Sequence, residues 1–184
     1  MIDFSRTPEQ EQMRATILRI LEELVYPAER ELTDDPPANE RQFFPGIPDR
    51  VMRPIQAKVK ARGFWAPHMP EEVGGMGIGV VGLALVNEII GRSPLGPVSF
   101  GCQAPDASNC EILHLYGTKE QKRRYLIPNV AGEMRSCFSM TEPEVSGADP
   151  TNLQTTAVLQ GAEWEINGHK WFTTGAVGAD FDIV

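Results

Sequence analysis

The sequence predicts an α+β protein. An all-α helical bundle, residues 1–134, is followed by the opening strands of an antiparallel β domain, residues 135–184. Two observations support this division. Apolar residues recur at helical spacing behind capping signals in the first part, and short strand-like runs separated by glycine turns replace them in the second. Because so few short strands cannot form an independent β domain, we expect the chain to be part of a longer protein.

The first helix is predicted to start at Thr7 and run to about Pro27. Thr7 is a good N-cap, Pro8 suits the first helical position, and Gln10 completes a capping box. Five apolar residues then form one stripe at helical spacing. These are Met13, Ile17, Ile20, Leu21 and Leu24.

The positions of glycine and proline predict where the next loops and helices begin and end. Residues 33–48 are rich in Asp and Pro and are expected to be a loop, and residues 49–62 a helix closed by Gly63. Residues 64–77 contain too much Gly and Pro for regular structure. Residues 80–90 are apolar enough to predict a helix buried on most sides, ended by Gly91.

Two more helices precede the change of pattern. One is predicted over residues 106–116. The next should start at Thr118, which forms a second capping box with Gln121, and end at Pro128.

The second part is predicted to contain hairpins. Residues 155–159 and 164–166 read as strands joined by a turn at Gln160-Gly161. Asn167-Gly168 is a strong signal for a further hairpin turn, with residues 170–174 as the returning strand. Residues 181–184 begin another strand.

Composition excludes several classes of function. The formal net charge is −8 and no basic stripe is present, which argues against nucleic acid as a partner. The three cysteines, Cys102, Cys110 and Cys137, form no CxxC pair, so we expect free thiols, no metal site and a reducing compartment. No apolar run approaches the roughly 20 residues of a membrane helix, and the N-terminus lacks signal-peptide character. A cytoplasmic location is therefore expected.

Two polar segments have a composition that suits a flavin. The ring system needs amides and hydroxyls at its heteroatoms and an apolar wall against its face. The loop 140–149 can provide amides, Thr173 and Thr174 provide hydroxyls, and Trp171 or Phe172 can cover an aromatic face. The same residues also suit a polar loop between two domains, followed by an ordinary hairpin.

Motifs along nearly the whole chain resemble those of the acyl-CoA dehydrogenase family. The loop resembles the family's flavin signature, and the segment after it resembles the second flavin-contacting segment. A Pro-Glu-Glu-x-Gly-Gly link and the helix before the β domain are also similar. The matching residues, in order, are 70–77, 117–122 with 125–128, Thr141-Glu142-Pro143 with Gly147 and Asp149, and 166–175.

The resemblance implies FAD as cofactor and an acyl-CoA substrate oxidised at Cα–Cβ to a trans-2-enoyl-CoA. It also implies an electron-transfer flavoprotein or similar acceptor and a homo-oligomer. The catalytic base of the family comes from beyond residue 184, so no catalytic residue is expected here, and Glu142 is expected to stabilise its loop. The alternatives are a non-catalytic helical fragment or interaction module, and an acyl-CoA oxidase-like flavoenzyme.

Roles follow from the resemblance residue by residue. The backbone of Met140 and Thr141 should meet the pyrimidine side of the flavin, and Thr174 should lie near N5 and O4. Phe172 stands where the family usually has a tryptophan. Ala148 replaces a serine that touches the diphosphate or the acyl-CoA, and Ser146 is the nearby hydroxyl, so these two are also the expected substrate contacts. The expected cofactor-binding residues are Phe138, Met140, Thr141, Ser146, Gly147, Ala148, Phe172, Thr173 and Thr174.

Overall fold

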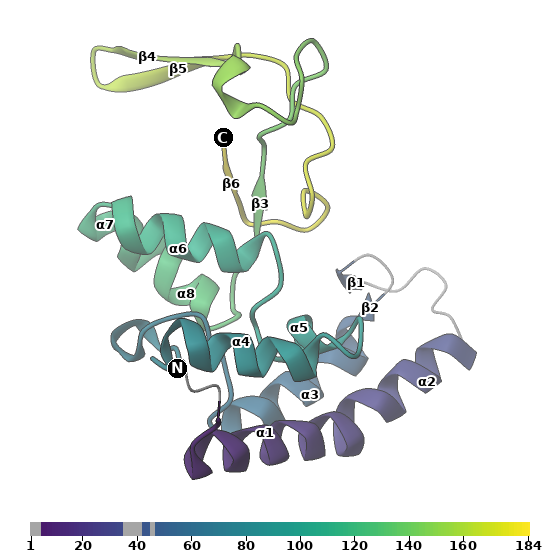
Figure 1. Cartoon of the computed structure of the whole chain (residues 1–184). Coiled ribbons are helices and arrows are strands. Elements are labelled where there is room, and N and C mark those ends of the chain that lie inside the picture. The colour runs from purple at the N-terminus through teal and green to yellow at the C-terminus, as the bar shows by residue number, and fades with distance from the viewer. Residues whose placement is uncertain (1–4, 35–41, 45–46) are drawn as a thin grey trace. The chain divides into compact units, whose positions relative to one another are not determined.

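A computed structural model describes residues 5–34, 42–44 and 47–184 (Figure 1). The chain divides into two compact units, Met1–Met134 and Arg135–Val184, called here the helical unit and the strand unit. The architecture is the predicted α+β arrangement, with a mainly helical unit followed by a unit of strands.

The helical unit begins with one continuous helix that is longer than predicted. It consists of α1 (Pro8–Ile20), a π-helical turn (Leu21–Val25) and α2 (Tyr26–Asp34) (Figure 1). The capping box at Thr7 is confirmed, because Gln10 N–H donates to the Thr7 hydroxyl and Thr7 N–H donates to the Gln10 side chain.

The predicted end at Pro27 is wrong, because the π turn accommodates the proline. Tyr26 N–H donates to the carbonyl of Leu21, five residues back. Proline has no N–H, and in a regular α-helix its ring meets the carbonyl four residues back. A turn widened in this way relieves the conflict, so the helix continues. The predicted loop 33–48 is also wrong in its described part, because residues 33 and 34 belong to α2 and residues 42–44 and 47–48 form two short antiparallel strands. Its positions 35–41 and 45–46 lie outside the described residues.

The same device recurs before Pro128. The segments α7 (Lys119–Gln121), a π turn (Lys122–Leu126) and α8 (Ile127–Val130) follow one another, and Ile127 N–H donates to the carbonyl of Lys122. The capping box between Thr118 and Gln121 is confirmed. The expectation that Pro128 ends this helix is wrong, since the chain remains helical to Val130.

The other predicted helices of the helical unit occur in the expected order. The helices predicted over 49–62 and 106–116 are confirmed, and Gly63 after the first of them has a φ of 77°. The remaining bounds are β1 (Gln42–Phe44), β2 (Ile47–Pro48), α3 (Asp49–Ala61), a 3-10 turn (Glu71–Val73), α4 (Gly79–Ile90), α5 (Gly96–Ser99) and α6 (Asp106–Tyr116).

The core of this unit is built mainly from the first helix with its π turn, α3, α4, and α5 with the residues that flank it. Ile17, Leu21, Met52, Val86 and Phe100 are all fully buried within it. The expectation that α4 is buried on most sides is wrong. Its later turns contribute Val86, Ile89 and Ile90 to the core, but Val80 and Val81 in its first turn are 84% and 67% exposed. Within the described residues, no helix has both the length and the apolar composition to cross a bilayer.

The strand unit contains two strand pairs. β4 (Thr156–Gln160) and β5 (Glu163–Asn167) form the predicted antiparallel hairpin, with Val158 opposite Glu165. β3 (Ser136–Phe138) pairs in parallel with β6 (Phe181–Ile183), and a short 3-10 turn (Pro150–Asn152) precedes the hairpin (Figure 1).

The predicted hairpin turn at Asn167-Gly168 is wrong. After β5 the chain does not return as a strand, and only Thr174 makes an isolated bridge, with Phe138. The glycine has a different use, because a Cβ at position 168 would lie 2.0 Å from Thr155 Oγ1. Gly168 therefore allows a close approach to Thr155, where a turn was expected.

Candidate functional site

The loop after β3 and the segment 170–174 lie side by side in the strand unit. Phe138 and Thr174 form an antiparallel bridge. Trp171 N–H donates to the Thr141 carbonyl at 3.1 Å, and the hydroxyls of Ser139 and Thr173 lie 3.1 Å apart. Two stretches about 30 residues apart in sequence are thus joined by three contacts, a backbone bridge, a backbone hydrogen bond and a contact between two hydroxyls.

Glu142 is the acceptor at the centre of this junction. Its carboxylate is buried and accepts from Lys170 Nζ at 2.8 Å, Thr155 Oγ1 at 2.6 Å, Gln154 N–H at 2.6 Å and Thr155 N–H at 2.9 Å. The hydrogen bond from Lys170, followed by those from Thr155 and Gln154, lowers the pKa of Glu142 to about 2. A carboxylate so fully occupied is a poor proton acceptor, which confirms its expected role in stabilising the loop.

Lys170 joins two parts of the loop to the segment that follows β5. Besides Glu142, its Nζ donates to the Met140 carbonyl at 2.9 Å. Its side chain is only 14% exposed, against 2% for that of Glu142. The ammonium therefore bridges a carbonyl and a carboxylate two residues apart on the same loop.

A second set of polar contacts orients Thr173. The Ser139 hydroxyl donates to the Asp182 carboxylate of β6. A hydroxyl has one proton, so in its contact with Thr173 the Ser139 oxygen must accept and Thr173 must donate. The Thr173 hydroxyl proton is thereby committed within the protein, whereas the Thr174 hydroxyl, which is exposed, has no partner in the described part of the chain.

Phe172 is held in an unusual backbone conformation. Its φ is +53°, in the left-handed region that costs a residue with a Cβ roughly 1 kcal/mol or more. Its ring is 77% exposed and lies 4.6 Å, centroid to centroid, from that of Trp171. The contacts of Lys170, Trp171 and Thr173 on either side fix this geometry, which presents an aromatic side chain to solvent.

The remaining predicted site residues lie on the exposed part of the loop. Ser146, Gly147 and Ala148 are all exposed, and Ala148 N–H donates to the Ser146 hydroxyl at 3.4 Å. Asp149 ends this stretch by accepting from the hydroxyl and the N–H of Thr151, which lowers its pKa. The other six predicted residues lie on the two joined segments.

Sequence reasoning missed the residues that hold the site together. Lys170 belongs to a recognised motif, but nothing local indicates that it reaches Met140 and Glu142. Ser139 lies between the predicted Phe138 and Met140 but was given no role of its own, and Asp182 was not singled out, because their contact spans 43 residues.

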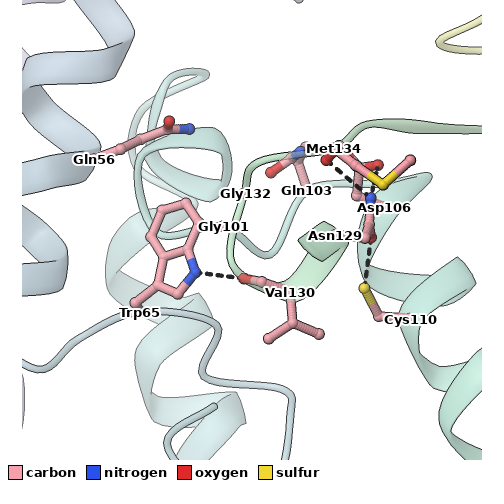
Figure 2. A pocket seen from close by; sticks show the side chains of 10 residues that line it. All are labelled: Gln56, Trp65, Gly101, Gln103, Asp106, Cys110, Asn129, Val130, Gly132 and Met134. Atoms are coloured by element: carbon pink, nitrogen blue, oxygen red, sulfur yellow. Dashed lines mark hydrogen bonds between the residues drawn. The ribbon is translucent and has the colours of Figure 1, made fainter. Parts of the chain in front are cut away.

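The helical unit contains a pocket that is too small for a substrate (Figure 2). Trp65 Nε1 donates to the Val130 carbonyl, and Asn129 donates to Asp106 and accepts from the Cys110 thiol. The cavity of about 20 Å³ has room for one water molecule. Burial raises the pKa of Cys110 to about 12, as it does for Cys102, so both thiols stay protonated.

No metal centre is found in the part of the chain that the structure describes. No group of three or more His, Cys, Asp or Glu side chains there is placed to hold an ion. The three cysteines are free.

Family models cover almost the whole chain. Residues 7–133 match the model described as "Acyl-CoA dehydrogenase, N-terminal domain", and residues 137–184 match "Acyl-CoA dehydrogenase, middle domain". The chain belongs to the acyl-CoA dehydrogenase family. The junction between loop 139–149 and segment 170–174 therefore lies in the middle-domain part of this acyl-CoA dehydrogenase family member.

Individual relatives agree with this assignment. The chain is 34% identical over 173 residues to human "Acyl-CoA dehydrogenase family member 11", covering 94% of this chain and 22% of that protein. It is 36% identical over 174 residues to mouse "Acyl-CoA dehydrogenase family member 10", covering 92% of this chain and 16% of that protein.

Solved structures share the fold. One from Mycobacterium abscessus, described as an acyl-CoA dehydrogenase, has a TM-score of 0.80 at 35% identity, over 94% of this chain and 44% of that one. An acyl-CoA dehydrogenase from Geobacillus kaustophilus has a TM-score of 0.68 at 26% identity, over 100% of this chain and 44% of that one. The chain thus spans less than half the length of each of these proteins.

Proposed function

We propose that this chain forms the helical domain and the first part of the middle domain of an FAD-dependent oxidoreductase. At the length of its relatives, the protein oxidises acyl-CoA thioesters between Cα and Cβ to trans-2-enoyl-CoA. The observation that supports this most directly is the junction of the two signature segments, through the Phe138–Thr174 bridge and the Trp171–Thr141 hydrogen bond. The family, whose members bind FAD in general, supplies the reaction class.

The polar groups at this junction that have no hydrogen-bond partner in the described part of the chain suit the edge of a flavin. Met140 and Thr141 have their carbonyls bound by Lys170 and Trp171, but their N–H groups donate to nothing in the described part of the chain. Two adjacent amides match the acceptors on the pyrimidine side of an isoalloxazine ring, and the Thr174 hydroxyl can donate near N5 and O4. When bound there, FAD supplies the hydride acceptor of the reaction.

The protein's own residues then bind and orient. Phe138 and Phe172, from the two segments, supply apolar surface, and the left-handed backbone at Phe172 keeps its ring exposed. Thr173 lies between Phe172 and Thr174 with its proton bound to Ser139, so it can only accept from a ligand.

The loop 146–148 is assigned to the anionic part of the ligands. Ser146, Gly147 and Ala148 are proposed to contact the diphosphate of FAD, and Ser146 and Ala148 the acyl-CoA. Exposed amides of an irregular loop bind anions even on a protein whose net charge is −8. The missing hydroxyl at Ala148 costs about 1 kcal/mol of ligand affinity, unless Ser146 compensates.

We also propose a place for the catalytic base, an electron acceptor, an oligomeric state and a cellular location. The catalytic base is assigned to a segment beyond residue 184, since Glu142 is occupied by its four donors. Electrons pass to an electron-transfer flavoprotein or a similar acceptor, and the enzyme is a cytoplasmic homo-oligomer.

The test is the visible spectrum of the protein expressed from the longest reading frame that contains this chain. We expect flavin absorption bands after purification, and their bleaching on mixing with an acyl-CoA without oxygen. A colourless protein that cannot be reconstituted with FAD overturns the proposal and favours an interaction module. Rapid reoxidation by oxygen alone indicates an oxidase instead of a dehydrogenase.

A further inference from the structure

We propose that Lys170 and Glu142 form a buried clamp that sets the geometry of the two flavin-contact segments, which makes Lys170 a positioning residue for FAD. The inference rests on the proposed function, and it adds two residues that make no expected contact with the cofactor themselves.

The clamp acts on three successive loop residues from one side. Lys170 Nζ holds the Met140 carbonyl at 2.9 Å and the Glu142 carboxylate at 2.8 Å, and Trp171 N–H holds the Thr141 carbonyl at 3.1 Å. With these groups fixed, the peptide planes around Met140 and Thr141 cannot rotate freely. The N–H of Thr141 lies in the same peptide plane as the Met140 carbonyl, so the direction of this N–H, which is proposed to meet the flavin, is set by segment 170–171.

Glu142 anchors the clamp to a third segment. The carboxylate also accepts from Gln154 N–H and from the N–H and hydroxyl of Thr155, at the start of the β4–β5 hairpin. Gly168 is essential to this arrangement, because any Cβ there would collide with Thr155. The loop, the start of the hairpin and the segment after it thus meet at one carboxylate.

Burial distinguishes this ion pair from those at the surface. Exposed pairs contribute little to stability, whereas removing one partner of a buried pair leaves an uncompensated charge. The side chains of Glu142 and Lys170 are 2% and 14% exposed. The pKa of Glu142, lowered to about 2 chiefly by Lys170, keeps the carboxylate charged throughout the physiological range.

The neighbouring residue provides a matched control. His169 Nδ1 lies 3.1 Å from Glu144 Oε1 and so also links the two segments, but these side chains are 67% and 55% exposed. A contact of this kind is expected to have little influence on the geometry.

The experiment compares Lys170→Met, Lys170→Arg and His169→Gln in the protein expressed from the longest reading frame. We expect Lys170→Met to raise the dissociation constant of FAD by roughly tenfold or more, the loss of a charge-assisted hydrogen bond. Flavin reduction should stay slow even at saturating FAD. Lys170→Arg, which keeps the charge and several donors, should recover most of both, and His169→Gln should match the wild type.

Hydrogen exchange of the FAD-free protein gives a second readout. Lys170→Met should speed exchange of the hydrogen-bonded amides of Trp171, Gln154 and Thr155 and leave the helical unit unchanged. If Lys170→Met does not fold, Glu142→Gln serves in its place, since its amide oxygen still accepts one hydrogen bond but carries no charge.

The outcomes separate the two proposals. A wild-type protein that binds no FAD overturns both the function and the clamp. A wild-type protein that binds FAD while Lys170→Met keeps the same affinity and reduction rate overturns the clamp alone. So does a Lys170→Met protein that is only less heat-stable and regains the wild-type reduction rate at saturating FAD.

Discussion

Each of the two units of this chain is stabilised internally by a different kind of interaction. The helical unit has a core of fully buried apolar side chains, such as Leu21, Met52 and Phe100. In the strand unit the large apolar side chains are mostly exposed, and the junction is formed by hydrogen bonds around Glu142 and Ser139. Apolar packing therefore determines whether the first unit folds, and a few charged contacts determine the local geometry of the second.

The hairpin shows the contrast most clearly. Leu159 pairs with Trp164 and Ala157 with Ile166, so these four side chains share one face of β4–β5. Leu159, Trp164 and Ile166 are nevertheless 55%, 64% and 54% exposed. On α4, by comparison, the buried face carries Val86 and Ile89 at 0% and 2%.

The largest expected effect comes from the core of the helical unit. Phe100→Ala should lower the free energy of unfolding by about 3–5 kcal/mol, since it removes a fully buried ring. Trp164→Ala, at an exposed position, should change it by no more than about 0.5 kcal/mol. Urea denaturation of the 184-residue chain, followed by far-ultraviolet circular dichroism, measures both. Similar losses in the two variants would contradict the contrast between the units.

Acid should weaken the two units in different pH ranges. Burial lowers the pKa of His68 in the helical unit to about 4 from 6.5, and neither ring nitrogen has a partner in the described part of the chain. The unfolded state thus takes up a proton first as the pH falls. Unfolding of this unit should become easier by on the order of 3 kcal/mol between pH 6.5 and 4.

Glu142 should make the strand unit sensitive to acid in a second, lower pH range. Its folded pKa is depressed to about 2 from 4.5, so its stabilising contribution is complete above pH 4.5 and is lost as the pH falls towards 2. Region-by-region hydrogen exchange against pH measures both ranges. His68→Phe should remove the upper one and leave the lower one, whereas Glu142→Gln should reduce the lower one, to which Asp149 also contributes, and leave the upper one. A single range shared by both units would rule out these assignments.

The two threonines at the junction should differ in catalysis. In the protein at the length of its relatives, Thr174→Val should slow flavin reduction by roughly tenfold or more, with a smaller change in acyl-CoA binding. Thr173→Val should have less effect, because that hydroxyl already donates to Ser139. Stopped-flow reduction at several acyl-CoA concentrations separates rate from binding. Equal rates in wild type and Thr174→Val remove the role assigned to this hydroxyl.

The smallest effect belongs to the capping boxes. Thr7→Ala should cost about 1 kcal/mol, because the N–H of Gln10 loses its acceptor. Thr16→Ala is the matched control within the same helix, and should not destabilise, since alanine is the best helix former. Thermal unfolding of the two variants is sufficient to compare them. A loss at Thr16 equal to that at Thr7 argues against the cap.

Much of the helical unit could be predicted because its signals are local. The caps at Thr7 and Thr118 and the helix over residues 106–116 depend on residues a few positions apart. The errors at Pro27 and Pro128 have a common origin. Proline usually ends a helix, and nothing in the neighbouring sequence indicated that a π turn would precede each one.

The candidate site was predictable in its location but not in its construction. The family motifs indicated the two segments and the supporting role of Glu142. The contacts of Lys170 with Met140 and of Ser139 with Asp182 span 30 and 43 residues, and such pairings depend on the folded chain path. The prediction of a hairpin turn at Gly168 failed for a related reason, since the role of this glycine depends on its close approach to Thr155.

The π turn at Leu21–Val25 also limits how the length of this helix can change. Each residue advances an α-helix by about 100°. A π turn takes up one extra residue without passing this rotation on, so Ala28 and Leu32 still reach the hydrophobic interior. Deleting Glu22 would restore regular α-helical hydrogen bonding and bring back the clash between the Pro27 ring and the carbonyl four residues before it. The π turn thus lets the helix contain Pro27 without losing the alignment of its two halves, and natural deletions at this point should be accompanied by the loss of Pro27.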